Sequence, residues 1–468
     1  MKTFRFVKAA ALLTFVCMLF AFGMHAEAKT GKDYEYTVNS DGKSITLDSY
    51  VGEAVGTLAI PSEIDGYKVT ATDSFLYTMF GLSPTGATID TIKIPSTLKE
   101  IGIGTFATLS MLKKIEVDSK NKYFTAEDGV LFNKSMDTLI CCPAAKKGEY
   151  DIPDKVKKIE AMAFYSCGKL TYVMIPDSVK EIQDSAFHHC GGLTSVDIPD
   201  SVQVIEKKAF AECDKLTSVR ISGSVKEIGA RAFQYCGRLN AATLSEGIVE
   251  IQENAFLQCK QLKEITIPGS VKTIEEQAFG YYEDEETYSG DMYKVSGFTV
   301  YGQKGSAAQT YAKENGFTFK EGKGKQAGPS SRFIYKKNKY KVTAAAKVEY
   351  LGPSSKTVKS VSIPATVKYD GKTYTVTAIA QNAFKDHAKL KSAVISKNIS
   401  KIGKGAFQNC KKLKKITIKT AKLKKSSVGS KAFKGIHKKA VFKLPKAKKK
   451  AYKKILLKKG ATKKMKFK

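Results

Sequence analysis

The chain has 468 residues and a formal net charge of +33, with 43% hydrophobic and 26% charged residues. This hydrophobic content excludes an intrinsically disordered protein, because disordered chains have too few apolar residues to form a core. The charge is uneven, since residues 331–468 hold 41 Lys and Arg against three Asp and Glu, whereas residues 1–330 hold 37 against 42. The basic end cannot be neutralised by internal ion pairs, and we expect it to face an anionic partner.

Residues 1–28 are predicted to be a secretory signal peptide. Three basic residues precede an apolar run over residues 9–23, and the small residues Ala26 and Ala28 form a cleavage pattern. The alternative, a transmembrane anchor, would need about 20 apolar residues. We therefore expect an exported, extracellular protein that has no membrane span after processing.

A 23-residue repeat occupies the middle of the chain. Six units follow one another without insertion, and they begin at Ile152, Ile175, Ile198, Ile221, Leu244 and Ile267. Each unit has Val or Ile four residues later, Ile seven residues later and then an Ala-Phe pair, and the first five units continue with Cys and Leu. A unit of this size is too small to bury its own apolar side chains. The units are therefore predicted to stack as a solenoid with a continuous core.

Each unit also predicts its own local structure. The Leu-x-x-Val-x-Ile stretch alternates with the period of a strand, so neighbouring coils should pair as a parallel sheet. Val196 and Ile198 would then point into the core, and Ser195 and Asp197 would point outward. The Ala-Phe-x-x-Cys spacing indicates a short turn whose Phe fills the core. The predicted fold class is thus a β-rich solenoid.

These residues carry a family resemblance. The pattern Ile-Pro-Asp-Ser-Val-Lys-Glu-Ile-x-x-x-Ala-Phe-x-x-Cys-x-x-Leu-x-x-Val resembles the BspA-type leucine-rich repeat of bacterial surface proteins, specifically over residues 152–279. More loosely, residues 94–115 resemble an earlier copy, residues 118–150 a hairpin insertion and residues 34–69 the N-terminal strands of such proteins. The resemblance implies right-handed leucine-rich-repeat coils and a secreted or surface-displayed binding protein, with no catalytic residues to carry over.

The sequence also predicts where the first array ends. Residues 296–320 have the pattern of a strand, a helix that ends at Gly316 and a second strand, which would cap the open end of the solenoid. The first array would therefore span residues 29–320. Residues 321–331 have the Gly, Ser and Pro composition of a flexible linker.

A second, Lys-rich array is predicted over residues 332–468. Its Phe384 and Phe407 are again 23 residues apart, and residues 446–459 indicate a helix for a second cap. We expect two arrays, each closed by a helix-strand cap and joined by a mobile hinge.

The sequence contains only weak residue patterns for a metal site, a cofactor site or a catalytic site. The Cys residues from Cys167 to Cys259 are predicted to form a buried packing ladder, because a zinc site favours paired Cys-x-x-Cys ligands. Spacing alone does not forbid a disulfide between adjacent rungs. His188 and His189 are interpreted as a variable surface position rather than a ligand pair, and residues 283–286 as a solvated acidic insertion rather than a calcium loop. We predict no metal, no cofactor and no enzymatic activity.

Two surfaces are candidates for binding. The outward positions of the first sheet mix both charge signs with few aromatic residues, which suits a protein or glycan partner better than a nucleic acid. The candidate binding face comprises Tyr172, Met174, Ser195, Asp197, Ser218, Arg220, Glu264 and Thr266. The candidate contacts for an anionic polymer are Lys411, Lys412, Lys414, Lys415, Lys448, Lys449 and Lys450.

The predicted function is non-catalytic binding or adhesion at the bacterial cell surface, without a covalent anchor. The first array would recognise a protein or glycan, and the basic array would hold an anionic polymer such as wall teichoic acid or an acidic glycan. Two alternatives remain. The basic array could bind extracellular nucleic acid, although its few aromatic residues offer no evident platform for stacking bases. The protein could also be a soluble secreted scaffold without a specific polymer partner.

Overall fold

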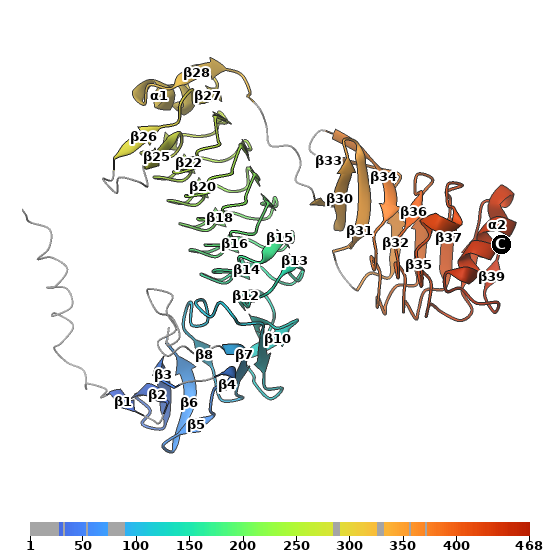
Figure 1. Ribbon diagram of the computed structural model, residues 1–468, viewed down its shortest axis with the longest axis horizontal. Coiled ribbons are helices and arrows are strands. Elements are labelled where there is room, and N and C mark those ends of the chain that lie inside the picture. Colours follow the sequence, from blue (N-terminus) through green and yellow to red (C-terminus); the bar gives the residue numbers. More distant parts are fainter. Residues whose placement is uncertain are drawn as a thin grey trace, which may run out of the picture.

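The computed structural model describes residues 28–30, 33–52, 55–73, 89–283, 291–324, 332–354, 357–369 and 372–468. The predicted signal peptide lies outside these residues apart from Ala28, and so does most of the acidic run 283–286. The described part of the chain is a solenoid of stacked parallel coils, as predicted (Figure 1). None of its helices is long and apolar enough to cross a membrane.

A mixed sheet of parallel and antiparallel strands begins the first array. Its strands are β1 (Ala28–Thr30), β2 (Tyr34–Val38), β3 (Ser44–Tyr50), β6 (Tyr67–Thr72) and β5 (Glu63–Ile64), with β8 (Glu100–Ile101) beside β6. A second, parallel sheet starts with β4 (Gly56–Ala59), β7 (Ile89–Ile94) and β9 (Lys114–Val117). The antiparallel strands β10 (Phe124–Glu127), β11 (Val130–Asn133) and β12 (Thr138–Cys141) follow. They lie where the sequence predicts a hairpin insertion.

The regular coils contribute two parallel ladders. One is made of two-residue strands that follow β12: β14 (Lys158–Ile159), β16 (Glu181–Ile182), β18 (Val204–Ile205), β20 (Glu227–Ile228), β22 (Glu250–Ile251) and β24 (Thr273–Ile274). The other, which we call the strand face, contains β13 (Gly148–Asp151), β15 (Leu170–Met174), β17 (Ser195–Asp197), β19 (Ser218–Ile221), β21 (Ala241–Leu244) and β23 (Glu264–Thr266). Partners on adjacent coils are 23 residues apart, as in Val196 and Val219. The repeat length therefore sets the register.

A column of stacked Phe rings forms the core between these ladders. The rings of Phe164, Phe187, Phe210, Phe233, Phe256 and Phe279 follow one another at centroid distances of 4.6 to 5.3 Å. All six side chains are buried. Beside them, the Cys thiols of successive coils are also buried. From Cys190 to Cys259, each donates a hydrogen bond to the Phe carbonyl one coil earlier, as Cys213 does to Phe187 at 3.4 Å.

The first array ends in a cap. After the antiparallel pair β25 (Tyr281–Glu283) and β26 (Met292–Lys294), strand β27 (Thr299–Gly302), helix α1 (Ala307–Glu314) and strand β28 (Thr318–Glu321) close the solenoid. Tyr311 of α1 packs edge-on against Phe279, the last ring of the column, at 6.3 Å. Its hydroxyl accepts a hydrogen bond from Phe279 N at 2.9 Å and donates one to Phe279 O at 2.7 Å. One side chain thus satisfies backbone groups that a further coil would otherwise pair.

The start of the predicted linker is bound to this cap. The backbone N–H of Gly322 donates to Gly302 O, and that of Gly324 donates to Thr266 Oγ1, both at 3.0 Å. Residues 325–331 lie outside the described residues.

The second array repeats the plan in shorter form. One sheet contains β29 (Arg332–Tyr335), β30 (Asn338–Ala344), β31 (Lys347–Pro353), β34 (Lys372–Ile379) and β33 (Thr366–Tyr369), with β36 (Lys401–Ile402) beside β34. The other contains β32 (Ser360–Ile363), β35 (Ser392–Ile395), β37 (Lys415–Ile418), β38 (Val441–Lys443) and β39 (Lys466–Phe467). Phe384, Phe407 and Phe433 form its ring column, with centroid distances of 4.7 and 5.4 Å.

The second cap uses the same device as the first. The region predicted as one helix begins with the 3-10 helix η2 (Lys446–Lys448) and continues as α2 (Lys449–Lys458). Tyr452 of α2 accepts a hydrogen bond from Leu423 N at 3.0 Å and donates one to Thr420 O at 3.1 Å. Both arrays are therefore closed by a tyrosine hydroxyl that bonds to backbone groups of the preceding loop.

Candidate functional sites

The candidate binding face lies along strands β15, β17, β19 and β23. The ladder places Ser195 beside Ser218 and Asp197 beside Arg220. Four of the eight side chains are buried, namely Tyr172, Met174, Ser195 and Thr266, and the other four are half-buried. Much of this face is therefore covered within the chain itself.

The cover over β13 and β15 comes from the second array, which lies beside the strand face (Figure 1). The Arg332 guanidinium pairs with Glu149 and lies 5.3 Å from the centre of the Tyr172 ring. Lys339 Nζ lies 2.7 Å from Asp151 Oδ2. The two basic side chains are only 12% and 13% exposed, so these ion pairs are partly withdrawn from solvent. The basic array is thus docked on acidic positions of the first array.

A cleft of about 610 Å³ remains between the two arrays. Arg220 borders it from the first array, and its guanidinium lies 5.9 Å from the centre of the Tyr369 ring of the second. Its lining combines aromatic rings with groups of both charge signs: Tyr172, Asp177, Asp197, Asp200 and Arg220 from the first array, and Phe333, Tyr335, Lys336, Lys368 and Tyr369 from the second.

Carboxylates at one repeat position line up along the edge of this cleft. Asp154, Asp177 and Asp200 are spaced by 23 residues, so they occupy equivalent places on three successive coils. Burial raises the pKa of Asp154 to about 6, although the positive charges of Lys339 and Lys337 oppose the rise. Burial, followed by repulsion from Asp200, raises the pKa of Asp177 as well. The first array therefore presents three aligned carboxylates on the side that faces the lysines of the second array.

All seven candidate contacts for an anionic polymer are exposed. Four lie in and before β37, and three lie at the junction of η2 and α2. No salt bridge joins any of them to a carboxylate within the described ranges. Lys448, Lys449 and Lys450 also stand at the N-terminal end of α2, where the helix dipole favours negative charge. The positive charges of these three lysines therefore interact unfavourably with the dipole of α2.

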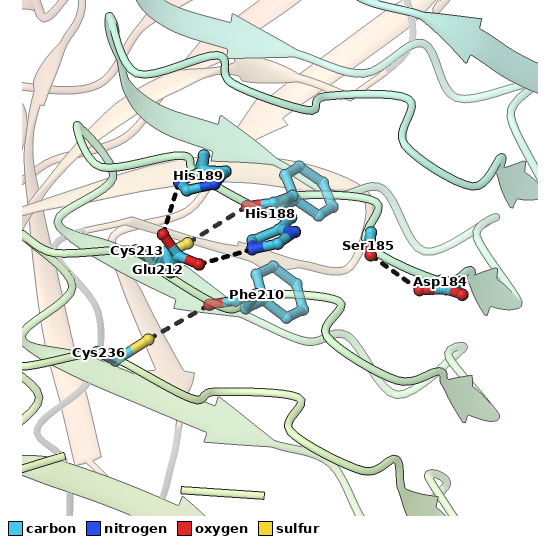
Figure 2. Close-up of polar contacts among 9 residues, drawn as sticks. Asp184, Ser185, His188, His189, Phe210, Glu212, Cys213 and Cys236 are labelled. Carbon is cyan, nitrogen blue, oxygen red and sulfur yellow. Dashed lines mark hydrogen bonds and ion pairs between the residues drawn. The ribbon is translucent and has the colours of Figure 1, made fainter. Parts of the chain in front are cut away.

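A third cluster joins His188 and His189 to Glu212 (Figure 2). His188 Nε2 lies 3.0 Å from Glu212 Oε1, and His189 Nδ1 lies 2.8 Å from Glu212 Oε2. Hydrogen bonds from both imidazoles lower the pKa of Glu212 to about 2, and the bond to Glu212 raises the pKa of His189. The sequence analysis treated the two His as a surface position without a ligand role. The signal for the cluster was the spacing of 23 residues between His189 and Glu212, which puts them on adjacent coils.

The sequence profile that describes the BspA type leucine rich repeat region matches six copies, over residues 85–147, 157–285 and 377–467. The chain belongs to this family. Proteins with such repeats are typically non-catalytic, surface-associated binding proteins of bacteria. No curated protein matches the chain significantly.

Several solved structures are similar to the chain at low identity. A leucine-rich repeat protein from Eubacterium ventriosum is 21% identical, with 54% of this chain and 87% of that chain covered and a TM-score of 0.43. The pneumococcal vaccine antigen PcpA is 15% identical, with coverage of 64% and 99% and a TM-score of 0.41. A leucine rich cell surface protein from Faecalibacterium prausnitzii is 21% identical, with coverage of 90% and 84% and a TM-score of 0.25.

Proposed function

We propose that the protein is a secreted, non-catalytic adhesion protein whose basic second array holds it on an anionic polymer of the bacterial cell surface. The observation that carries the proposal is the set of seven exposed lysines, which form no salt bridge with any residue that the structure describes. They lie in a segment that has no acidic side chain after Asp386. A lysine ammonium is a compact charge that binds phosphate or sulfate without demanding one geometry. Wall teichoic acid, a polymer of phosphodiesters, has the matching chemistry.

The first array supplies recognition of a protein or glycan in this proposal. The cleft between the arrays places the rings of Tyr172, Tyr335 and Tyr369 close to carboxylates such as Asp197. Aromatic surfaces with a few polar groups are typical of ligand pockets. A glycan would pack its sugar rings on the half-buried Tyr335 and Tyr369 and donate hydroxyl hydrogen bonds to the acids.

Polymer binding is tested by measuring the affinity of the purified protein for immobilised wall teichoic acid as salt is raised. Each lysine that contacts a phosphate releases a counterion, so a log–log plot of affinity against salt should be steep. Replacing Lys411, Lys412, Lys414 and Lys415 with Gln should flatten its slope by about 3. The matched control replaces four exposed lysines of the first array, Lys155, Lys180, Lys215 and Lys272, and should leave the slope unchanged.

Three results would contradict this proposal. Equal slopes for the two quadruple variants would show that the second array does not contact the polymer. DNA that displaces teichoic acid at equal phosphate concentration would favour extracellular nucleic-acid binding. Failure to bind any polyanion, even at low salt, would favour a soluble scaffold.

Recognition by the cleft is tested with an array of cell-surface glycans and host proteins, probed with the intact protein. We expect Tyr335→Ala to weaken binding of any ligand found, because its ring borders the cleft. Tyr293→Ala, a change at an exposed tyrosine of β26, is the matched control. Equal loss in both variants, or none in either, would place recognition elsewhere.

A further inference from the structure

The cluster of His188, His189 and Glu212 is built by the repeat and not by a local motif. His189 and Glu212 follow the Phe of their coils at the same distance, and both have left-handed backbone angles, with φ of 59° and 58°. The N–H of His189 donates to Ala211 O at 3.0 Å, which holds the two turns together. Three ligand-type side chains from adjacent coils therefore meet at one point of the surface.

The nitrogen and oxygen atoms of the cluster have the separation that a small ion requires. One ligand atom from each side chain can be chosen so that all three lie within 4.8 Å of one another. Around tetrahedral zinc, with bonds of about 2.0–2.2 Å, neighbouring ligand atoms are about 3.4 Å apart. The observed N···O distances of 3.0 and 2.8 Å need to open by only a few tenths of an ångström.

The imidazoles are already oriented toward the carboxylate. Their rings are stacked at 4.4 Å with an interplanar angle of 5°, and Tyr165 packs edge-on against both at 5.3 and 5.5 Å. The His188 side chain is 13% exposed, which limits its rotamers, whereas that of His189 is 43% exposed. The cluster thus has a fixed inner side and an open outer side, where a water molecule can complete the coordination.

The local charge also suits a cation. Glu212 offers a carboxylate, and Asp214 lies close enough to interact electrostatically with both Glu212 and His189. The positive charges of Arg238 and Lys215 also interact with Asp214. Two imidazoles with one carboxylate form a ligand set that zinc proteins use, and imidazole also suits copper and nickel. Calcium and magnesium prefer sites made only of oxygen atoms.

We propose that His188, His189 and Glu212 bind one Zn²⁺ ion, with water as the fourth ligand. The ion would join the coil that begins at Ile175 to the coil that begins at Ile198. Its role is structural, because it links the side chains of two adjacent coils.

The test is isothermal titration of the tag-free, metal-depleted protein with ZnCl₂. We expect one ion per chain, and at least a 10- to 100-fold loss of affinity in His189→Gln and Glu212→Gln. His437→Gln changes a histidine of the second array and is the matched control, which should bind like the unchanged protein. Circular dichroism of each variant establishes that it is folded.

A second readout separates a coordinated ion from loose association. Co²⁺ bound by nitrogen and oxygen ligands in a tetrahedral site should give strong visible absorption in the unchanged protein and in His437→Gln, but not in Glu212→Gln. Zn²⁺ should also raise the melting temperature of the same two proteins, because an ion that binds only the folded state stabilises it. Absence of stoichiometric Zn²⁺ binding, or equal binding by Glu212→Gln, would overturn the proposal and leave the cluster as a hydrogen-bonded triad.

Discussion

Phe210 tests whether the ring column holds the coils together. It lies in the middle of the first array, fully buried, with Phe187 stacked on one side at 4.9 Å and Phe233 on the other at 5.3 Å. The planes are nearly parallel, at 5° and 3°. Phe210→Ala would therefore remove one ring and both of its stacked pairs.

The expected loss follows from these contacts. Truncation of a buried Phe to Ala costs about 3–5 kcal/mol. Stacking adds about 0.5–1.5 kcal/mol per aromatic pair beyond the buried area. Because two pairs are lost and rigid coils on both sides limit collapse of the cavity, we expect about 5 kcal/mol. Phe210→Leu keeps most of the volume and loses the stacking, so it should cost about 1–3 kcal/mol.

Native-state hydrogen exchange measures this loss coil by coil. A decrease of 5 kcal/mol corresponds to a fall of between three and four orders of magnitude in protection, at 1.4 kcal/mol for each factor of ten. The fall should be greatest in residues 175–243 and should leave the second array unchanged, because each coil of a solenoid contacts only its neighbours. A loss below about 1.5 kcal/mol, or equal losses in both arrays, would refute the reasoning.

Two other predictions concern the contact between the arrays. Lys339→Ala removes the ion pair with Asp151, and Arg332→Ala removes the pair with Glu149. The double variant should show a broader distribution of distances between the arrays, measured by energy transfer between fluorophores on each array. Salt should have the same effect on the unchanged protein, and a distance that neither change alters would contradict the electrostatic contact. Burial raises the pKa of Asp154 above its unfolded value of 3.8, so the folded state favours the protonated acid. The unfolding free energy should therefore fall as pH rises from about 4 to about 6, and urea titrations should show a smaller fall in Asp154→Asn. An identical pH dependence in this variant would assign the effect to other acids.

The coils could be predicted because the 23-residue interval of the repeat determines how their strands pair. Ile182, Ile205 and Ile228 recur at the interval that pairs β16, β18 and β20, so the register of the sheet can be read from the sequence. The helix of the first cap could also be predicted, because Gly316 marks where it must end. The sequence does not reveal the role of the Tyr311 hydroxyl, because a hydrogen bond from a side chain to the backbone leaves no residue pattern.

Contacts outside the repeat were not predictable in this way. Tyr172 and Met174 were assigned outward positions, and they do leave the core of their own array, but the second array then buries them. The composition of residues 321–331 indicated a mobile hinge, and the charge of the basic array indicated an anionic partner without identifying the first array as that partner. Alternation along a strand reports which face a side chain takes and says nothing about what covers that face.

The thiol ladder gives each coil a chemical reporter of its own opening. Cys190, Cys213, Cys236 and Cys259 are all buried, and burial raises the pKa values of Cys190, Cys213 and Cys259, so a reagent cannot reach a reactive sulfur while the coils are closed. An alkylating reagent can therefore modify each sulfur only during local unfolding. The order in which these cysteines are alkylated would show where the solenoid first opens, without any engineered label.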